Sequence, residues 1–312
     1  MAVVLFMEPE VTPMSWEEFC ATKPPFSCAF DGYVRAAPKY DDDGPYANFD
    51  HHSEVSRMET RSACSQFRMA IHMRIFDRFS VDGQPHMNLH MRDNDPDNCT
   101  VKYLADNPHH VRGIVNSRVN RLIYMEDILD TTGGAYPMSE DLHDLRRIAW
   151  IYDPYFVFKQ SGRLDTEKTA QAYTDIMDLV CERIQAFVDG KGRAQDLDTR
   201  FDLVKEFDGW SLVHEIGAQA RTGMFSKGIN AFVSCRKGSL GKYVYTLCKM
   251  TPYTRIKLLP IYAALNRAEN PENGTWGGSN IVGGSPQPHG SDLPPLEVAR
   301  IFDENKYNKI IV

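Results

Sequence analysis

The residues in this chain with the most evident chemistry are an aspartate and two histidines in a row, Asp50, His51 and His52. A carboxylate beside two imidazoles offers ligands that suit Mn²⁺, Fe²⁺, Zn²⁺ or Co²⁺. The tripeptide alone is not rare, so its meaning depends on further acidic residues elsewhere in the chain. The sequence predicts a divalent-metal site here if other carboxylates reach the histidines.

Further carboxylates occur where strands or helices are expected to begin or end. Asp31 ends a short apolar run that is typical of a buried strand, and ligands of α/β proteins gather at strand ends. Asp95 and Asp97 precede a helical pattern, for which a solvated turn with a helix N-cap is the alternative. Another apolar segment ends at Asp127 and Asp130, and helical spacing lets either face inward. Together with the histidines, these acids suffice for two metal ions about 3.5–4 Å apart.

Three segments resemble the motifs of the DHH phosphoesterase superfamily. They are Phe30-Asp31-Gly32, Asn48-Phe49-Asp50-His51-His52 and Asp95-Pro96-Asp97. The superfamily includes single-strand exonucleases, oligoribonucleases, cyclic-dinucleotide phosphodiesterases and inorganic pyrophosphatases. Its DxD motif normally comes first in the chain, whereas here it follows Asp-His-His, so the resemblance is to a divergent member with a permuted motif order. A permuted connection leaves the same cluster in space, because metal geometry depends on position rather than on chain order.

The resemblance implies a hydrolase that holds two divalent ions, with Mn²⁺ as the first expectation and Mg²⁺ or Co²⁺ as further candidates. It also implies that His52 lies nearer the substrate phosphate than the metal ligands do. The implied ligands come from four places in the chain: Asp31, Asp50, His51, Asp95, Asp97 and either Asp127 or Asp130.

Cations and paired glycines are candidates for holding the rest of a phosphorylated substrate. Arg57 and Arg61 follow the histidines, and Arg236 lies beside an expected hairpin; a guanidinium matches a phosphate well, although a solvated surface role is the alternative. The family's second domain commonly carries a glycine-rich substrate loop, and a segment here is similar in placement. Paired glycines expose backbone N–H groups that can approach a phosphate, although a flexible surface loop is the alternative. The glycines concerned are Gly277, Gly278, Gly283 and Gly284.

Length and composition indicate a packed globular protein of two domains, with 312 residues of which 42% are hydrophobic and 25% charged. The net charge of −7 favours a small phosphorylated substrate or a short oligonucleotide over an extended duplex, which usually meets a basic surface. Seven cysteines without paired spacing fit reduced thiols in a cytoplasmic protein. The first apolar run ends at Met7, too early for a signal peptide or a membrane span. An oligomer is compatible with all of this.

The expected elements place the candidate ligands in an α/β domain. Strands are expected at the N-terminus and at residues 28–31, and the stretches 36–46 and around Gly83 and Pro85 read as loops. Helices are expected from Trp16 with Ser15 as cap, over 56–78, from Cys99, over about 111–125, and over 166–189 with Asp165 as cap. Further along, a hairpin over 230–235 and 242–249 is expected, then a helix over 261–268, the glycine-rich loop and a final helix from residue 296.

We therefore expect a two-domain α/β protein. Residues 1–192 would form a metal-binding domain with a largely parallel sheet and flanking helices, and residues 193–312 a smaller α+β substrate-binding domain with the glycine-rich loop. The predicted function is hydrolysis of a small phosphoester, a (cyclic) nucleotide or a short oligonucleotide by two metal ions in an interdomain cleft. The alternatives are a non-catalytic nucleotide- or partner-binding protein that retains the fold, and a metal hydrolase acting on amides.

Overall fold

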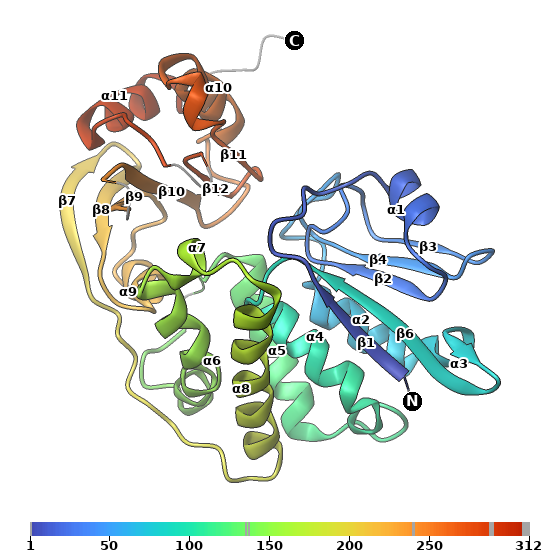
Figure 1. Ribbon diagram of the computed structural model, residues 1–312. Helices are drawn as coiled ribbons and strands as arrows, with labels where there is room; N and C mark the ends of the chain where they lie inside the picture. The colour runs from blue at the N-terminus through green and yellow to red at the C-terminus, as the bar shows by residue number, and fades with distance from the viewer. Residues whose placement is uncertain (1, 135, 137, 239–240, 287–289, 308–312) are drawn as a thin grey trace. The chain divides into compact units, whose positions relative to one another are not determined.

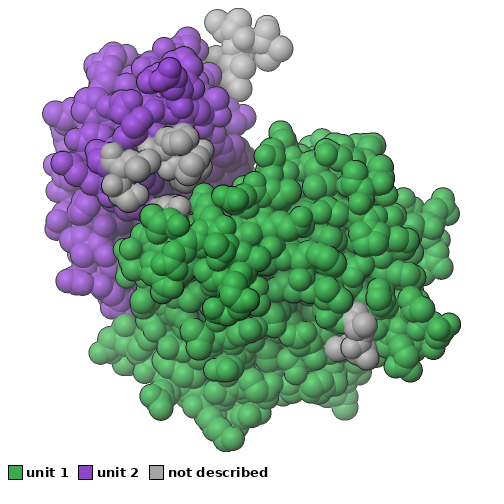
Figure 2. All heavy atoms as spheres, viewed as in Figure 1, with its two compact units in different colours: residues 1–131, 143–196 green, residues 132–142, 197–312 purple. Residues whose placement is uncertain are grey.

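The chain forms two compact units in the computed structural model, which describes residues 2–134, 136, 138–238, 241–286 and 290–307 (Figures 1 and 2). The first unit comprises residues 1–131 and 143–196, and the second comprises residues 132–142 and 197–312. The expected border at residue 192 lies close to the observed one, but no pattern in the sequence indicated that residues 132–142 group with the second unit. Among the described residues, no helix has both the length and the apolar character needed to cross a membrane.

A mixed six-stranded sheet forms the centre of the first unit (Figure 1). The strand order is β1-β6-β2-β4-β3, and β5 pairs with β6. The four strands β1, β6, β2 and β4 run parallel, whereas β3 and β5 are antiparallel to their neighbours. The strands are β1 (Ala2–Met7), β2 (Ser27–Phe30), β3 (Lys39–Asp41), β4 (Tyr46–Phe49), β5 (Ser80–Val81) and β6 (Gln84–Met91). The largely parallel sheet expected from the sequence thus applies to these four strands only.

Strand β6 was expected to be a loop, and its position brings the acids at 93–97 to the sheet edge where Asp31 and Asp50 lie. The strand lies between β1 and β2, and its polar residues alternate with Met87, Leu89 and Met91, a period-two pattern that the loop prediction overlooked. The carboxyl ends of adjacent parallel strands meet at one edge of a sheet. The acids at 93–97 follow β6, Asp31 follows β2 and Asp50 follows β4. Three motifs that are distant in sequence therefore share one sheet edge.

Helices surround this sheet, and several of them confirm the expected boundaries. Ser15 caps α1 by accepting a hydrogen bond from the backbone N–H of Glu18, as predicted. The helix expected over 56–78 is two helices, α2 and α3, and α6 was not predicted. Thr169 rather than Asp165 caps α8. The helices are α1 (Trp16–Thr22), α2 (Ala63–His72), α3 (Ile75–Arg78), α4 (Pro96–Asp106), α5 (Ser117–Thr131), α6 (His143–Gln160), α7 (Arg163–Thr166) and α8 (Ala170–Val188).

The second unit contains another mixed six-stranded sheet, in the order β11-β12-β10-β9-β8-β7. Only β8 and β9 are parallel, and β9 with β10 confirms the expected hairpin. The strands are β7 (Phe201–Phe207), β8 (Trp210–Glu215), β9 (Ala231–Lys237), β10 (Tyr243–Lys249), β11 (Gly277–Gly278) and β12 (Val282–Gly284). Helices α10 (Leu258–Ala268) and α11 (Pro295–Asn305) share an apolar core with the sheet, and α9 (Ala220–Ser226) contributes to a second core cluster.

The glycine-rich segment is a β-hairpin and not the loop expected from the sequence. Gly277 pairs with Gly284, and Gly278 pairs with Gly283. A Cβ atom on Gly283 would overlap the hydroxyl group of Tyr262, and one on Gly278 would overlap the backbone of Gly283. Close packing within the second unit therefore accounts for Gly278 and Gly283 without a ligand.

Gly284→Val is expected to destabilise the protein by about 1–3 kcal/mol, because overpacking forces the backbone to move. A Cβ atom there would overlap the carbonyl oxygen of Tyr245. Gly277→Ala is the matched control: no described atom lies within 4 Å of its Cβ position, so stability should change by less than about 0.5 kcal/mol. Urea denaturation measures both, and equal stability of the two variants would contradict the packing explanation.

Candidate metal centre

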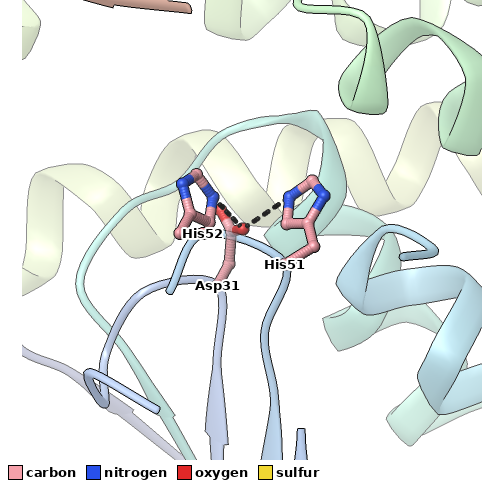
Figure 3. A group of neighbouring side chains, drawn as sticks. All are labelled: Asp31, His51 and His52. Carbon is pink, nitrogen blue, oxygen red and sulfur yellow. Dashed lines mark hydrogen bonds and ion pairs between the residues drawn. The ribbon is translucent and has the colours of Figure 1, made fainter. Parts of the chain in front are cut away.

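The candidate metal ligands converge at the carboxyl edge of the parallel strands in the first unit. Asp31 directly follows β2, and residues 50–52 directly follow β4. Asp97 lies in the first turn of α4, and Asp130 lies in the last turn of α5. Figure 3 shows the carboxylate of Asp31 with the ring of His51 on one side and that of His52 on the other.

His51 is the centre of this cluster. Its Nε2 atom lies 3.2 Å from Oδ1 of Asp31 and 2.9 Å from Oδ2 of Asp130. A ligand oxygen of Asp97 lies within 4.8 Å of ligand atoms of both His51 and Asp130. Adjacent ligands at about 2.1 Å from an octahedral ion are about 3.0 Å apart. The spacing around His51 therefore fits a set of ligands for one divalent cation.

Several polar atoms of this cluster are buried without a hydrogen bond. Both ring nitrogens of His51 and Oδ2 of Asp130 have no hydrogen-bond partner among the described residues. Nε2 and Oδ2 approach closely, but without the angles of a hydrogen bond. Leaving a buried polar atom unsatisfied costs about 1–3 kcal/mol. A cation between the two atoms would satisfy both, so the residues fit a metal ion.

The electrostatics also favour a cation, because acidic groups crowd this region. Burial, together with the charges of Asp130 and Asp31, raises the pKa of Asp97 to about 7. Burial and neighbouring acids raise the pKa of Asp95 and of Glu126 well above the ordinary range. A divalent ion would neutralise charges that otherwise repel one another.

His51 is the residue whose ion pairs with Asp31 and Asp130 most affect the pKa values in this cluster. Burial lowers its pKa, but Asp130 and Asp31 outweigh burial and raise the pKa to about 10. Burial raises the pKa of Asp31, but His52 and His51 more than reverse this and hold that pKa well below the ordinary range. The pKa of Asp130 is likewise lowered, because His51 and Arg57 outweigh burial. The pKa values of His51 and of the two acids thus shift in the directions that an ion pair between them produces.

Asp50, predicted to be a ligand, instead organises the backbone. Its Oδ1 accepts hydrogen bonds from the N–H groups of Gly32 at 2.9 Å and His52 at 3.0 Å, and its Oδ2 accepts one from Ser53 at 3.0 Å. The aspartate therefore ties the loop after β2 to the loop after β4. Two groups of described side chains lie close enough to share an ion, namely Asp31, His51 and His52, and His51, Asp97 and Asp130; Asp50 belongs to neither ligand group.

Asp95 and Asp127 also lie outside the two ligand groups that the described residues form. Asp95 caps α4 by accepting a hydrogen bond from the backbone N–H of Asn98 at 2.9 Å. Asp127 accepts one from the N–H of Ser62 at 2.7 Å and lies 3.5 Å from a nitrogen of Arg61. Of the two acids in α5 that the sequence left open, Asp130 is the one whose carboxylate contacts His51.

Asp97 is held by the N-terminus of a second helix. Its two oxygens accept hydrogen bonds from the backbone N–H groups of Ala63 at 2.7 Å and Cys64 at 2.8 Å. These N–H groups open α2 and have no carbonyl partner within that helix, and the helix dipole favours a carboxylate there. The acid expected from the DxD motif is therefore fixed in place at the cluster.

Arg57 was expected to bind phosphate, but its guanidinium group holds site residues. Its Nη2 donates to the backbone carbonyl and to Oδ1 of Asp130, both at 3.0 Å, and its Nη1 donates to Nδ1 of His52 at 3.1 Å. The residue is 7% exposed. Arg61 has a side chain that is 60% exposed, and Arg236 is an exposed residue of β9 in the second unit.

The contact with Arg57 decides the tautomer of His52. A guanidinium only donates, so Nδ1 of His52 must accept, and the ring proton then lies on Nε2. Nε2 lies 2.6 Å from Oδ1 of Asp31 and donates to it. His52 is therefore a hydrogen-bond donor in this arrangement and not a metal ligand.

Glu126 is a member of this region that the sequence-based prediction missed. It is 4% exposed and lies one helical turn before Asp130 on α5. The signal was the spacing of four residues between two acids, which places both on one helix face.

Comparison with known proteins finds no family model, no curated protein and no solved structure that matches this chain. The resemblance to the DHH superfamily therefore rests on the motifs themselves.

Proposed function

We propose that this protein is a metal-dependent phosphoesterase of the DHH type. Its substrate would be a small phosphoester, a (cyclic) nucleotide or a short oligonucleotide, and its ions two divalent cations, with Mn²⁺ the first candidate. The observation that carries the proposal is the buried cluster of Asp31, His51, Asp97 and Asp130, whose spacing and unsatisfied atoms fit a cation. Such ions lower the pKa of a bound water and polarise a phosphoryl group.

His51, Asp97 and Asp130 would hold one ion, with Asp31 in contact with His51 beside them. The second ion would have to use the remaining oxygens of Asp31 and Asp97 together with a neighbouring acid, of which Asp95 is the one expected from the sequence. Asp95 already caps α4 through one oxygen, which leaves its other oxygen for a ligand role. The metal content of the protein distinguishes one ion from two.

His52 is the residue we assign to the substrate. Its side chain is 37% exposed, whereas that of His51 is fully buried. The hydrogen bond from Arg57 keeps a proton on Nε2. This N–H group donates to Asp31 in the protein without substrate, and in a substrate complex it would donate a hydrogen bond to a phosphate oxygen instead.

The test combines metal analysis with a substrate panel. Purified protein is analysed for bound metal and assayed with Mn²⁺ on a phosphodiester, a cyclic dinucleotide, a short oligonucleotide, pyrophosphate and an amide. We expect one or two ions per chain and Mn²⁺-dependent hydrolysis of at least one phosphate ester or anhydride. Bound ions with binding but no turnover of nucleotides would favour the non-catalytic alternative, and turnover of the amide alone would favour a different hydrolase.

Arg57→Lys is expected to lower kcat on the active phosphoester by about 10- to 100-fold, as is usual when a residue that orients a site is lost. Lysine keeps the charge but loses the fork that reaches both His52 and Asp130. Arg61→Lys is the matched control, since that side chain is mostly exposed and its kcat should stay close to wild type. Steady-state kinetics with parallel metal analysis measures both. Equal kcat in the two variants would show that the fork is dispensable.

A further inference from the structure

Asn98 is a buried polar residue of the first unit to which neither motif nor composition drew attention. It lies in the first turn of α4, directly after Asp97, and is 0% exposed. Its side-chain nitrogen lies 3.5 Å from Oδ2 of Asp31. Its side-chain oxygen Oδ1 has no hydrogen-bond partner among the described residues. The nitrogen of the amide thus contacts the cluster of candidate ligands, and its oxygen has no hydrogen bond among the described residues.

The two oxygens of the Asp31 carboxylate have different partners. His51 and His52 both contact Oδ1 of Asp31, whereas Asn98 contacts Oδ2. An NH₂ group on Oδ2 fixes the plane of the carboxylate, so that Oδ1 keeps facing the histidines. This is the usual way in which a neighbouring hydrogen bond orients a metal ligand.

The unsatisfied oxygen has few candidate partners in these surroundings. An ionised carboxylate such as that of Asp31 only accepts hydrogen bonds, so the amide oxygen gains nothing from it. Water is one partner for such an oxygen, and a cation is another. Amide oxygens are ordinary ligands of hard divalent ions.

Two other buried asparagines provide an internal comparison. Asn48 and Asn94 also have a side-chain oxygen without a hydrogen bond among the described residues. Their side-chain nitrogens donate to backbone carbonyls, that of Ala36 for Asn48 and that of Tyr173 for Asn94. Of these three asparagines, Asn98 is the one whose amide contacts an acid of the cluster.

We propose that Asn98 belongs to the metal centre: its NH₂ group positions Asp31, and its amide oxygen is a neutral ligand of a divalent cation. This inference rests on the proposed metal centre and adds a statement about the kind of ion. An extra oxygen ligand raises the coordination number. A coordination number of about six suits Mn²⁺ or Mg²⁺, whereas Zn²⁺ commonly binds four ligands. The centre would then prefer hard, six-coordinate ions.

The experiment measures ion binding by the full chain with Asn98→Leu and, as matched control, Asn94→Leu. Isothermal titration of metal-free protein with Mn²⁺ and with Zn²⁺ gives the two affinities. In Asn98→Leu, the Kd for Mn²⁺ should rise at least about tenfold, and the Mn²⁺-to-Zn²⁺ affinity ratio should fall by a similar factor. Asn94→Leu should bind both ions as the wild type does.

Asn98→Asp is the second variant, since it keeps an oxygen and adds charge. Its affinity for Mn²⁺ should match or exceed that of the wild type, while its metal-free form melts at a lower temperature because another acid joins a crowded cluster. If Asn98→Leu does not fold, the ligand role is tested with Asn98→Asp instead. Loss of Mn²⁺ binding in folded Asn98→Asp would overturn the ligand role.

The outcomes separate this inference from the proposed function. Wild-type Mn²⁺ affinity and ion preference in Asn98→Leu would overturn the role of Asn98 and leave the metal centre standing. A wild-type protein that binds neither ion would overturn the metal centre, and the role of Asn98 with it. Ion binding that depends on Asn98, in a protein that hydrolyses no phosphoester, would support the inference and contradict the phosphoesterase.

Discussion

Asp130→Asn is expected to lower the affinity of the protein for Mn²⁺ by about 100-fold or more, whereas Asp127→Asn leaves it close to the wild-type value. Loss of a residue that merely supports a ligand costs about 10- to 100-fold, so loss of the ligand itself should cost at least the upper value. Oδ2 of Asp130 lies 2.9 Å from Nε2 of His51, but the carboxylate of Asp127 faces Ser62 and Arg61. Asparagine keeps the shape of either side chain and removes its charge.

The control variant Asp127→Asn should lower the stability of the protein, so an unchanged Mn²⁺ affinity would not mean that the substitution has no effect at all. Asp127 accepts a hydrogen bond from the N–H of Ser62, directly before α2, so Asp127→Asn should cost about 1 kcal/mol of stability. Titration with Mn²⁺ and thermal denaturation without metal are measured on both variants. Equal Mn²⁺ affinities of Asp127→Asn and Asp130→Asn would show that α5 supplies no ligand, and the four-residue cluster would lose one member.

The carboxyl-edge acids illustrate what the sequence was able to predict. Asp31 follows a short apolar run, and that local signal placed the strand end correctly. His51 follows an acid, and it stays a predicted ligand that lies beside Asp31. Asp97 was found through the DxD motif although the strand before it was read as a loop. Local motifs therefore identified the cluster better than strand patterns identified the sheet that assembles it.

Other features depended on tertiary contacts that no local pattern contains. Strand β6 had a local signal in the alternation of polar residues with Met87, Leu89 and Met91, but the burial of its polar residues Asn88 and His90 depends on the neighbouring elements. The choice of Asp130 over Asp127 depends on the rotation of α5 relative to the sheet. Arg57 looked like a free cation because its partners are 5 and 73 residues away in the chain. The glycines were interpreted as a ligand loop because the close packing of Gly283 against Tyr262 cannot be predicted from the sequence.

The affinity for Mn²⁺ is expected to depend steeply on pH, with Kd falling about tenfold for each pH unit between 7 and 9. In the metal-free protein the pKa of His51 is raised to about 10, because Asp130 and Asp31 outweigh the effect of burial. The ring is therefore protonated across this range, and a metal ligand must be neutral. Each ion that binds at Nε2 must expel one proton. Below pH 7 the dependence should steepen, because the pKa of Asp97 is raised to about 7 by burial and by neighbouring acids, and its proton must leave as well.

Rising pH should lower the stability of the metal-free protein, and bound Mn²⁺ should offset that loss. The pKa of His51 in the folded, metal-free protein lies above its unfolded value of 6.5, so its contribution to stability is fully present below pH 6.5 and is lost as the pH rises through 10. Bound Mn²⁺ replaces the proton, so the increase in Tm that Mn²⁺ causes should be larger at pH 9 than at pH 6. Titration calorimetry in buffers of different ionisation enthalpy counts the released protons, and we expect about one at pH 8 and between one and two at pH 6.5. Asp127→Asn should show the same count as the wild type, since that acid faces away from His51. A Kd that does not change between pH 7 and 9 would mean that His51 is already neutral, or that it is not the ligand.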